Sequence, residues 1–233
     1  MSQATNLSEG LDDVADRELL ADLSRVLTAG DVVLDIGAHH GEFAQRLMSR
    51  IDVAVHAFEP VPDSFALLTA AAGSWPALRP VPMAVDDVPY ETSTEFHVQV
   101  GDAGSSLLMP IPHQTSTWAT YKSSIEVRCT SITAYVDAVG VARVGLLKSD
   151  AQGADLRVIR SAEPLFRAGR IGAVLVEANF HAFYRDQNSF ADIVAYMDTA
   201  GFFLAGFYRH FNRLGFLWWA DVLFLPRVPQ FAT

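Results

Sequence analysis

The sequence predicts a doubly wound α/β domain with a mainly parallel sheet of seven strands. Apolar runs of strand length alternate with segments of helical period over residues 31–226. Strands that alternate with helices along a chain form a parallel sheet joined by right-handed crossovers. The first run, at 32–37, is short, apolar and closed by a glycine, which is typical of a strand buried on both faces.

The first third of the chain supplies three of the strands. An amphipathic helix over 11–28 belongs to an N-terminal helical segment, 1–30, that precedes the domain. Two prolines in the third strand indicate an edge position or a strand end. The expected order is strand 32–37, helix 42–49, strand 53–58, helix 63–72 and strand 79–85.

Residues 86–130 interrupt this alternation. The segments at 94–100 and 125–129 alternate polar and apolar residues, which is typical of half-exposed antiparallel strands. The residues between them are rich in Ser, Thr and Pro, so we interpret 86–130 as an inserted β-rich cover over the domain.

The alternation then resumes and completes the sheet. The last helix begins after Ser189, a residue type that caps helix N-termini. Two apolar runs near the C-terminus, 202–207 and 217–225, are expected to close the sheet as an antiparallel pair. Before them we expect helix 131–139, strand 144–150, helix 153–162 and strand 171–178.

The composition narrows the possible partners. The net charge of −10 gives no electrostatic footprint for a nucleic acid and disfavours anionic lipid. Cys129 is the only cysteine, so no disulfide forms within the chain and no thiolate zinc site is available. The polar N-terminus and the lack of a long apolar run predict a cytoplasmic protein without a membrane partner. An aromatic cover is compatible with a homodimer.

The turn after the first strand reads D-x-G-x-x-x-G, with Asp35, Gly37 and Gly41 at the named positions. Glycines let the backbone turn sharply and approach a ligand closely. A dinucleotide loop would read G-x-G-x-x-G and face a diphosphate. An acid in the loop suits the cationic methionine part of S-adenosylmethionine better, and Ala38 is expected to contact the same cofactor.

A second acid stands where a cofactor ribose is expected. Glu59 follows the second strand, about one βαβ unit after the loop, where a carboxylate accepts hydrogen bonds from ribose hydroxyls. By position Ala84 is expected on the adenine side, and Ser106 at the methionine carboxylate or a substrate hydroxyl. The alternative is a pair of turn glycines and an unrelated surface acid.

The chain resembles the FkbM-type methyltransferases. The matching segments are LDIGAHHGEF (34–43), FEPVPDSFALL (58–68), GSSL (104–107), LLKSDAQGADLRVI (146–159), VLVEANF (174–180) and ADVLFL (220–225). The resemblance implies the class I, Rossmann-like methyltransferase fold and S-adenosylmethionine-dependent O-methylation of sugars or natural products. The chain departs from the family at His39, where Asn is usual, and at Gln152 and Asp155, where Glu is usual.

Acids at the ends of the fourth and fifth strands are the candidates for catalysis. Asp150, Glu177 and Asn179 are expected to converge on one cleft, because adjacent parallel strands lie about 4.8 Å apart. Asp150 is expected to contact the cofactor, and it can act as, or orient, a general base. Alternatively the three side chains are oxygen ligands for Mg²⁺. A purely structural interpretation has Asp150 capping the next helix and Glu177 pairing with Arg185.

Other side chains are weaker candidates. His181 is the histidine that we expect as a base, against the alternative of a solvated loop residue. Lys148 is expected to pair with an acid or to face away from the ligand. Buried Asp221 requires a partner. The expected substrate contacts are His39, His113, Trp118 and Tyr121.

The sequence therefore predicts an S-adenosylmethionine-dependent O-methyltransferase acting on a hydroxyl of a small molecule. An NAD-dependent oxidoreductase shares the fold and the ribose-binding acid, but the glycine spacing differs. A catalytically degenerate binding subunit is the third alternative, and the residues at 152 and 155 leave room for it.

Overall fold

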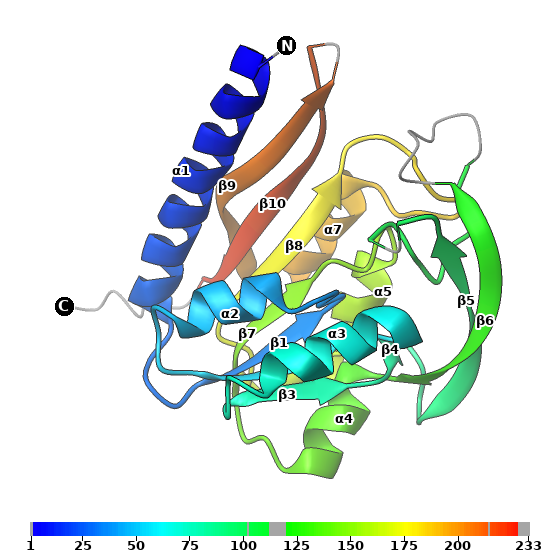
Figure 1. The fold of residues 1–233 in the computed structure, drawn as a ribbon. Helices are drawn as coiled ribbons and strands as arrows, with labels where there is room; N and C mark the ends of the chain where they lie inside the picture. The colour runs from blue at the N-terminus through cyan, green and yellow to red at the C-terminus, as the bar shows by residue number, and fades with distance from the viewer. Residues whose placement is uncertain (1, 102, 112–119, 214, 228–233) are drawn as a thin grey trace.

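A seven-stranded sheet forms the centre of the computed structural model, which describes residues 2–101, 103–111, 120–213 and 215–227, with backbone alone for 2–13 and 213. The strand order is β3-β2-β1-β7-β8-β10-β9, and every pairing is parallel except those of β10 (Figure 1). This order confirms the predicted fold class. The strands are β1 (Val32–Ile36), β2 (Ala54–Phe58), β3 (Leu78–Val81), β7 (Val144–Ser149), β8 (Val174–Asn179), β9 (Phe202–Arg213) and β10 (Phe216–Pro226).

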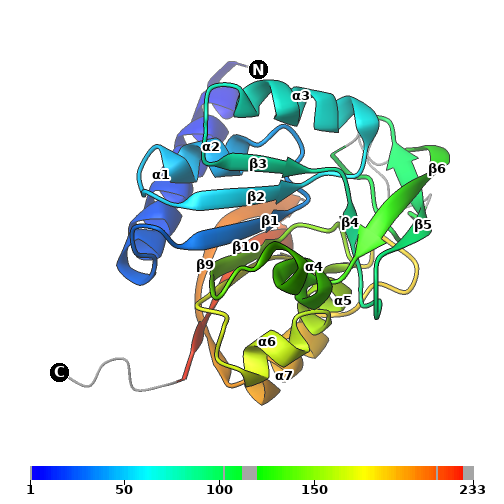
Figure 2. The same cartoon turned by 90° about the horizontal axis from the view of Figure 1, so that it is seen from below.

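Helices cover both faces of this sheet, as Figure 2 shows. One layer consists of α1 (Ser2–Val26), α2 (Glu42–Met48) and α3 (Pro62–Ala72). The opposite layer consists of α4 (Ile132–Val139), α5 (Asp155–Arg160), α6 (Glu163–Arg167) and α7 (Phe190–Thr199). Each layer encloses its own apolar core, which explains why the central strands are apolar on both faces.

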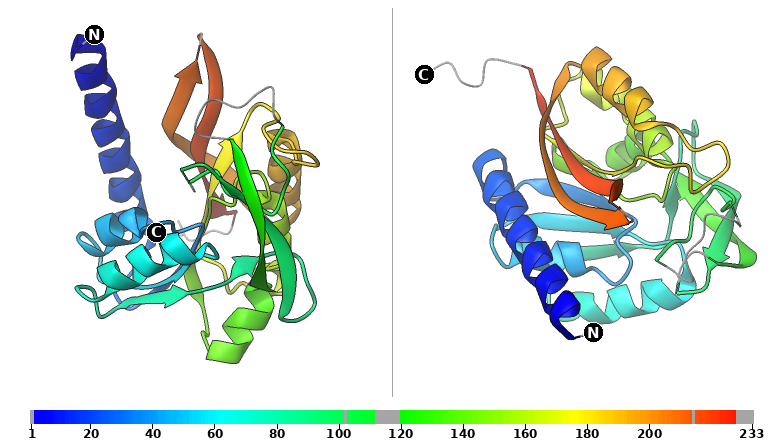
Figure 3. Two further views of the ribbon diagram at one scale, coloured as in Figure 1. Left: turned by 45° about the vertical axis from the view of Figure 1, so that its right-hand side comes forward. Right: turned by 90° about the horizontal axis from the view of Figure 1, so that it is seen from above.

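Local signals place the helix ends. Ser189 accepts a hydrogen bond from the backbone N–H of Asp192, whose side chain in turn accepts one from the N–H of Ser189, so the predicted cap is a complete capping box. The predicted helix at 153–162 is shorter, because Pro164 starts the separate helix α6. The N-terminal helix packs beside β9 (Figure 3). There the Tyr208 hydroxyl donates to Asp22 at 2.7 Å.

The predicted cover contains a second, smaller sheet. Its strands, in the order β4-β6-β5, are β4 (Ala84–Val85), β5 (Thr92–Gln99) and β6 (Tyr121–Thr130). The antiparallel pairing of β5 with β6 confirms the alternation pattern. The single strand predicted at 79–85 is wrong: Pro82 separates β3, an edge strand of the large sheet, from β4, which pairs with β6. The small sheet lies beyond the carboxyl ends of β1–β3 (Figure 2).

Within the described part of the chain, no helix combines the length and the apolar character that a membrane span requires.

Candidate functional site

The turn after β1 has a backbone that only particular residues adopt. Gly37 has φ +73°, and a Cβ there would lie 2.0 Å from the backbone oxygen of Asp150. Gly41 has φ +85° and precedes α2. His39 has φ +51°, in the left-handed region where Asn, Asp and His are enriched. Replacing the usual Asn by His therefore preserves the loop conformation.

Glu59 holds this loop in place from the end of β2. Its Oε2 accepts a hydrogen bond of 3.0 Å from the backbone N–H of His39, and its Oε1 accepts one of 2.8 Å from Val61. The side chain is buried but faces the cavity described next. Carboxylate oxygens accept more than one hydrogen bond, so Glu59 retains acceptor capacity for a ligand hydroxyl.

A first cavity of about 300 Å³ opens above the carboxyl ends of β1, β2 and β7. This is the edge where open α/β sheets bind their ligands. The small sheet and the segment around Ser105 form the opposite wall. Among the predicted cofactor residues, the lining includes Gly37, Ala38, Glu59, Ala84 and Asp150, and His39 lines it as well.

A second cavity of about 360 Å³ adjoins the first. Asp150 and Gln152 line both, so they stand where the two cavities meet. Asn179 Nδ2 is buried here and has no hydrogen-bond partner among the described residues. A buried donor without a partner is costly, so it marks a position where a ligand oxygen would be stabilised. The remaining walls are Glu177, Phe183, Tyr184, Phe211 and Trp219, with Ala103 and Arg209 shared with the first cavity.

The amide of Gln152 joins the two predicted catalytic acids. Its Nε2 donates to Asp150 Oδ1 and to Glu177 Oε1, each at 2.8 Å. Ionised carboxylates only accept, so the amide N–H₂ is the end that faces them. The Tyr184 hydroxyl lies 2.9 Å from Gln152 Oε1 and holds the opposite end. The acids converge as predicted, but around a hydrogen-bond donor.

This arrangement does not fit a divalent cation between Asp150 and Glu177. Mg²⁺ requires oxygen ligands in near-octahedral geometry. The space between the two carboxylates holds an N–H₂ group, which donates hydrogen bonds and cannot ligate a cation. Glutamate, the residue usual in the family at 152, would place a third carboxylate there. The substitution to Gln thus replaces a repulsive contact by two hydrogen bonds.

Burial shifts the pKa values of the acids around the second cavity. Burial raises the pKa of Glu177 well above its usual value, and the charges of Asp150 and Asp221 raise it further. Glu177 and Asp221 are direct partners across β8 and β10. Burial also raises the pKa of Asp221 to about 6, although Arg209 Nε, 3.8 Å away, opposes the shift. Arg209 is the partner that buried Asp221 requires.

Lys148 connects Asp35 of the loop to Asp150. Its Nζ lies 2.8 Å from Asp35 Oδ1 and 3.8 Å from Asp150 Oδ2. Asp35 and Lys148 are partners in register across β1 and β7, and residues 148 and 150 point to the same side of the strand. Burial disfavours the charged amine, but Asp35 and Asp150 together raise the pKa of Lys148 above its usual value.

Asp35 itself lies behind the cavity. Its side chain is fully buried, and among the described residues its oxygens have no well-directed hydrogen bond, so the ion pair with Lys148 is its compensation. The expected direct contact between Asp35 and a methionine moiety therefore finds no support in its position. Asp35 does not line the first cavity, but its partner Lys148 does, so Asp35 acts on the cavity by holding the Lys148 amine.

The net charge of this site is negative. Asp35, Asp150, Glu177 and Asp221 surround the two cations Lys148 and Arg209. A site with an excess of acids in a low-dielectric surrounding favours a cationic ligand over a diphosphate.

Two other polar residues near the site make hydrogen bonds within the protein and do not face a cavity. The buried Ser106 hydroxyl donates to the Gln152 carbonyl at 2.8 Å, and Ser105 lines the first cavity in its place. Asp155, rather than Asp150, accepts hydrogen bonds at the start of α5, from Ala151 and Gly153.

The aromatic and histidine candidates lie mostly away from the cavities. His181 is exposed, with its ring 5.4 Å from that of Trp218, because the chain turns outward after β8. Tyr121 is exposed on β6 and lines neither cavity. His113 and Trp118 lie outside the described residues.

Sequence patterns missed three residues of the site. Gln152, Tyr184 and Arg209 come from three different segments, and only the folded chain brings them to the acids. Gln152 was visible as a departure from the family pattern, and this departure was its only signal. Tyr184 and Arg209 carry no local motif.

The strand order, with an antiparallel β10 and a glycine loop after β1, defines a class I methyltransferase fold. The family model of the methyltransferase FkbM domain matches residues 35–204. The chain therefore belongs to the FkbM methyltransferase family, which confirms the resemblance in the sequence.

Solved structures of methyltransferases share this fold at low sequence identity. An FkbM methyltransferase from Methylobacillus flagellatus KT is 13% identical with a TM-score of 0.53, over 84% of this chain and 43% of its own. Magnesium protoporphyrin IX methyltransferase from Synechocystis PCC 6803, solved with S-adenosylmethionine, is 10% identical with a TM-score of 0.52, over 95% of this chain and 80% of its own. The chain thus spans less than half of the Methylobacillus protein. No curated protein sequence matches it.

Proposed function

We propose that the protein is an S-adenosylmethionine-dependent O-methyltransferase that acts on a hydroxyl of a small molecule. The observation that supports this proposal is that Asp150 lines both of the adjoining cavities. We assign the first cavity to the cofactor and the second to the acceptor.

The residues of the first cavity fit S-adenosylmethionine. Gly37 lets the loop pass close to the Asp150 carbonyl, where a Cβ would clash, and it lines the cavity with backbone. Glu59 offers acceptor oxygens to ribose hydroxyls. The excess of acids around Lys148 suits a sulfonium cation. Met83, Ala84 and Val85 form an apolar wall for the adenine.

The acceptor cavity combines aromatic walls with oriented polar groups. Phe211 and Trp219 have stacked rings 6.0 Å apart, and they suit the flat or apolar body of an acceptor. Asn179 Nδ2 provides a donor for an acceptor oxygen. When bound, S-adenosylmethionine supplies an activated methyl group for in-line displacement by that oxygen. Asp150 orients the hydroxyl and accepts its hydrogen, while Gln152 holds the carboxylate in place.

Cofactor identity is tested by calorimetric titration of the wild-type protein. We expect S-adenosylhomocysteine to bind and NAD not to bind, because the loop lacks the diphosphate spacing. NAD binding instead would favour an oxidoreductase. Binding of neither ligand, or binding without turnover on any acceptor, would favour a degenerate binding subunit. Transfer of tritiated methyl onto a panel of hydroxyl, amine and carbon acceptors tests the O-specificity.

A Glu59→Ala variant is expected to weaken S-adenosylhomocysteine binding by at least about tenfold. The variant removes the acceptor for the ribose and the carboxylate that anchors the His39 N–H. The measurement is isothermal titration calorimetry of both proteins. Glu126→Ala, at an exposed glutamate on β6, is the matched control and should bind like the wild type. Equal affinities in all three proteins would remove Glu59 from the cofactor site.

Activity is expected to be independent of Mg²⁺. Gln152 already satisfies Asp150 and Glu177 by hydrogen bonds, so the two acids require no cation. Initial rates in excess chelator and in added Mg²⁺ should agree within about twofold. A rate that collapses in chelator and returns with Mg²⁺ would show that the amide yields its place to an ion.

A further inference from the structure

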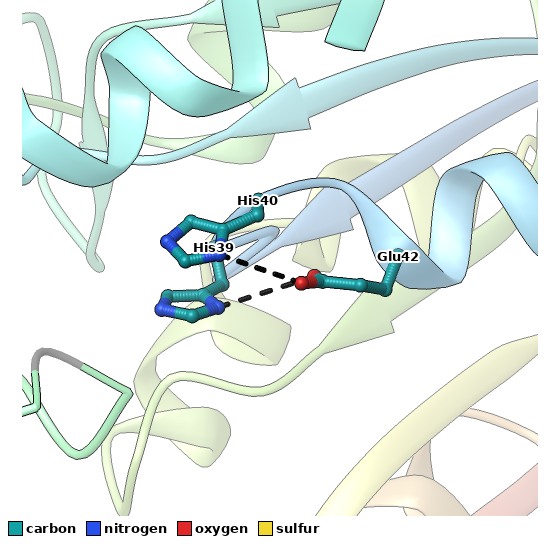
Figure 4. A group of neighbouring side chains, drawn as sticks. All are labelled: His39, His40 and Glu42. Carbon is teal, nitrogen blue, oxygen red and sulfur yellow. Dashed lines mark ion pairs between the residues drawn. The ribbon is translucent and has the colours of Figure 1, made fainter.

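Three metal-ligating side chains meet at the start of α2, apart from the catalytic acids. His39 and His40 have stacked rings, with centroids 3.5 Å apart and an interplanar angle of 22°. The Nδ1 atoms of both rings turn to the carboxylate of Glu42 (Figure 4). Of the described His, Cys, Asp and Glu residues, these are the ones whose ligand atoms gather within 4.8 Å of one another as a group of three.

The three ligand atoms lie close enough together for side-chain rotation to bring them around a shared ion, since all are within 4.8 Å of one another. His40 Nδ1 lies 3.5 Å from Glu42 Oε1, and His39 Nδ1 lies 3.9 Å from Oε2. These distances are too long for charge-assisted hydrogen bonds, which measure about 2.7–2.9 Å. Ligand atoms about 2.0–2.1 Å from a tetrahedral ion lie about 3.3–3.4 Å from one another. The stacked rings face one another, so both imidazoles must rotate out of the stack about their side-chain bonds before their Nδ1 atoms point at one ion.

The backbone fixes the three side chains close together. Left-handed conformations at His39 and Gly41 fold the loop back on itself, and Glu59 anchors the His39 N–H at 3.0 Å. Each imidazole side chain is about one third exposed, and Glu42 is about half exposed, so an ion can enter from solvent. The ion would therefore have to order side chains but not the backbone of this loop.

We propose that His39, His40 and Glu42 form a binding site for a transition-metal ion, of which Zn²⁺ is the best match. Two imidazoles and one carboxylate are a ligand set that zinc accepts, with a fourth position left for water or another ligand. Imidazole nitrogen favours Zn²⁺, Ni²⁺, Co²⁺ or Cu²⁺ over Mg²⁺. The ion would lie at the rim of the first cavity, because His39 and Glu42 line it.

The test is calorimetric titration of ZnCl₂ into full-length protein that carries no polyhistidine tag and has been dialysed against chelator. We expect one ion per chain. His40→Ala and Glu42→Gln should each weaken binding by at least about tenfold, because each removes one ligand. His210→Ala is the matched control, since His210 is exposed on β9, outside the cluster, and this variant should bind like the wild type.

A spectroscopic readout separates the proposed site from scattered surface binding. Co²⁺ bound to the wild type should give the intense visible bands of a tetrahedral ion, and Glu42→Gln should lose them. Circular dichroism confirms that each variant is folded before titration. Absence of a one-to-one complex in the wild type, or unchanged zinc affinity in folded His40→Ala and Glu42→Gln, would overturn the proposal.

Discussion

A Lys148→Met variant should lose about 3–5 kcal/mol of unfolding free energy, because it leaves a buried carboxylate without its partner. Asp35 is fully buried, and the Lys148 amine at 2.8 Å is its compensating charge. Methionine fills a similar volume, so the loss reports the charge rather than a cavity. Urea unfolding of the wild type and of Lys148→Met at about pH 7.5 measures the difference in unfolding free energy.

The pH dependence of this loss has a defined sign. Burial raises the pKa of Asp35, and Lys148 opposes that shift, so removing Lys148 raises the pKa further. A group whose folded-state pKa is raised contributes stability that is present at low pH and is lost as the pH rises through the folded-state pKa. The deficit of Lys148→Met should therefore shrink toward acidic pH, from neutral pH down toward the usual aspartate pKa.

Two further proteins complete this test. Asp35→Asn/Lys148→Met removes both charges and should recover most of the lost stability, with the pH dependence gone. Lys122→Met, at an exposed lysine on β6, should unfold like the wild type. A single variant as stable as the wild type across the pH range would contradict the assignment of Lys148 as the partner that holds Asp35.

Much of the fold follows from local patterns in the chain. The run at 32–37 and the glycines that follow it specify a buried strand and a tight turn, and the structure places both there. Ser189 specifies a helix start by its own hydrogen bond. The position of Glu59 at the first cavity was predictable, because a regular crossover places it one βαβ unit after the glycine loop.

The expectations that the structure does not bear out depend on contacts between segments distant in sequence. In the pairing of β4 with β6, Ala84 and Val85 each pair with a residue 45 positions later (129 − 84 and 130 − 85), so no local pattern at 79–85 reveals it. The same holds for Asp35: its acid type suggested a ligand contact, but its register with Lys148 on β7 determines its partner. His181 was favoured by proximity in sequence to Glu177, yet the turn after β8 carries it to the surface.

Gln152 shows how one atom changes the chemistry expected of a site. A carboxylate at 152 would give three acids converging on one point, and a cation would then relieve their repulsion. The Gln152 amide instead donates one hydrogen bond to Asp150 and one to Glu177, so it bridges the two acids. Under the proposed function, Asp150, which lines both cavities, is the side chain that we assign to accept the proton of an acceptor hydroxyl.

Asp150→Asn should accordingly lower kcat by about 10²–10⁴-fold, the range that loss of a general base produces. Asn keeps the size of the side chain and accepts one hydrogen bond, but it does not take a proton. The affinity for S-adenosylhomocysteine should change by less than about fivefold, because the loop and Glu59 are untouched. Single-turnover methyl transfer at saturating cofactor measures the rate.

The division between kcat and cofactor affinity decides the role of Asp150. A normal single-turnover rate at saturating cofactor, with weakened S-adenosylhomocysteine binding, would make Asp150 a cofactor-binding residue and leave proton transfer to Glu177. The control is Asp63→Asn, at an exposed residue of α3 outside both cavities. Burial raises the pKa of Glu177 above its usual value. Glu177 lines the second cavity alone, whereas Asp150 lines both.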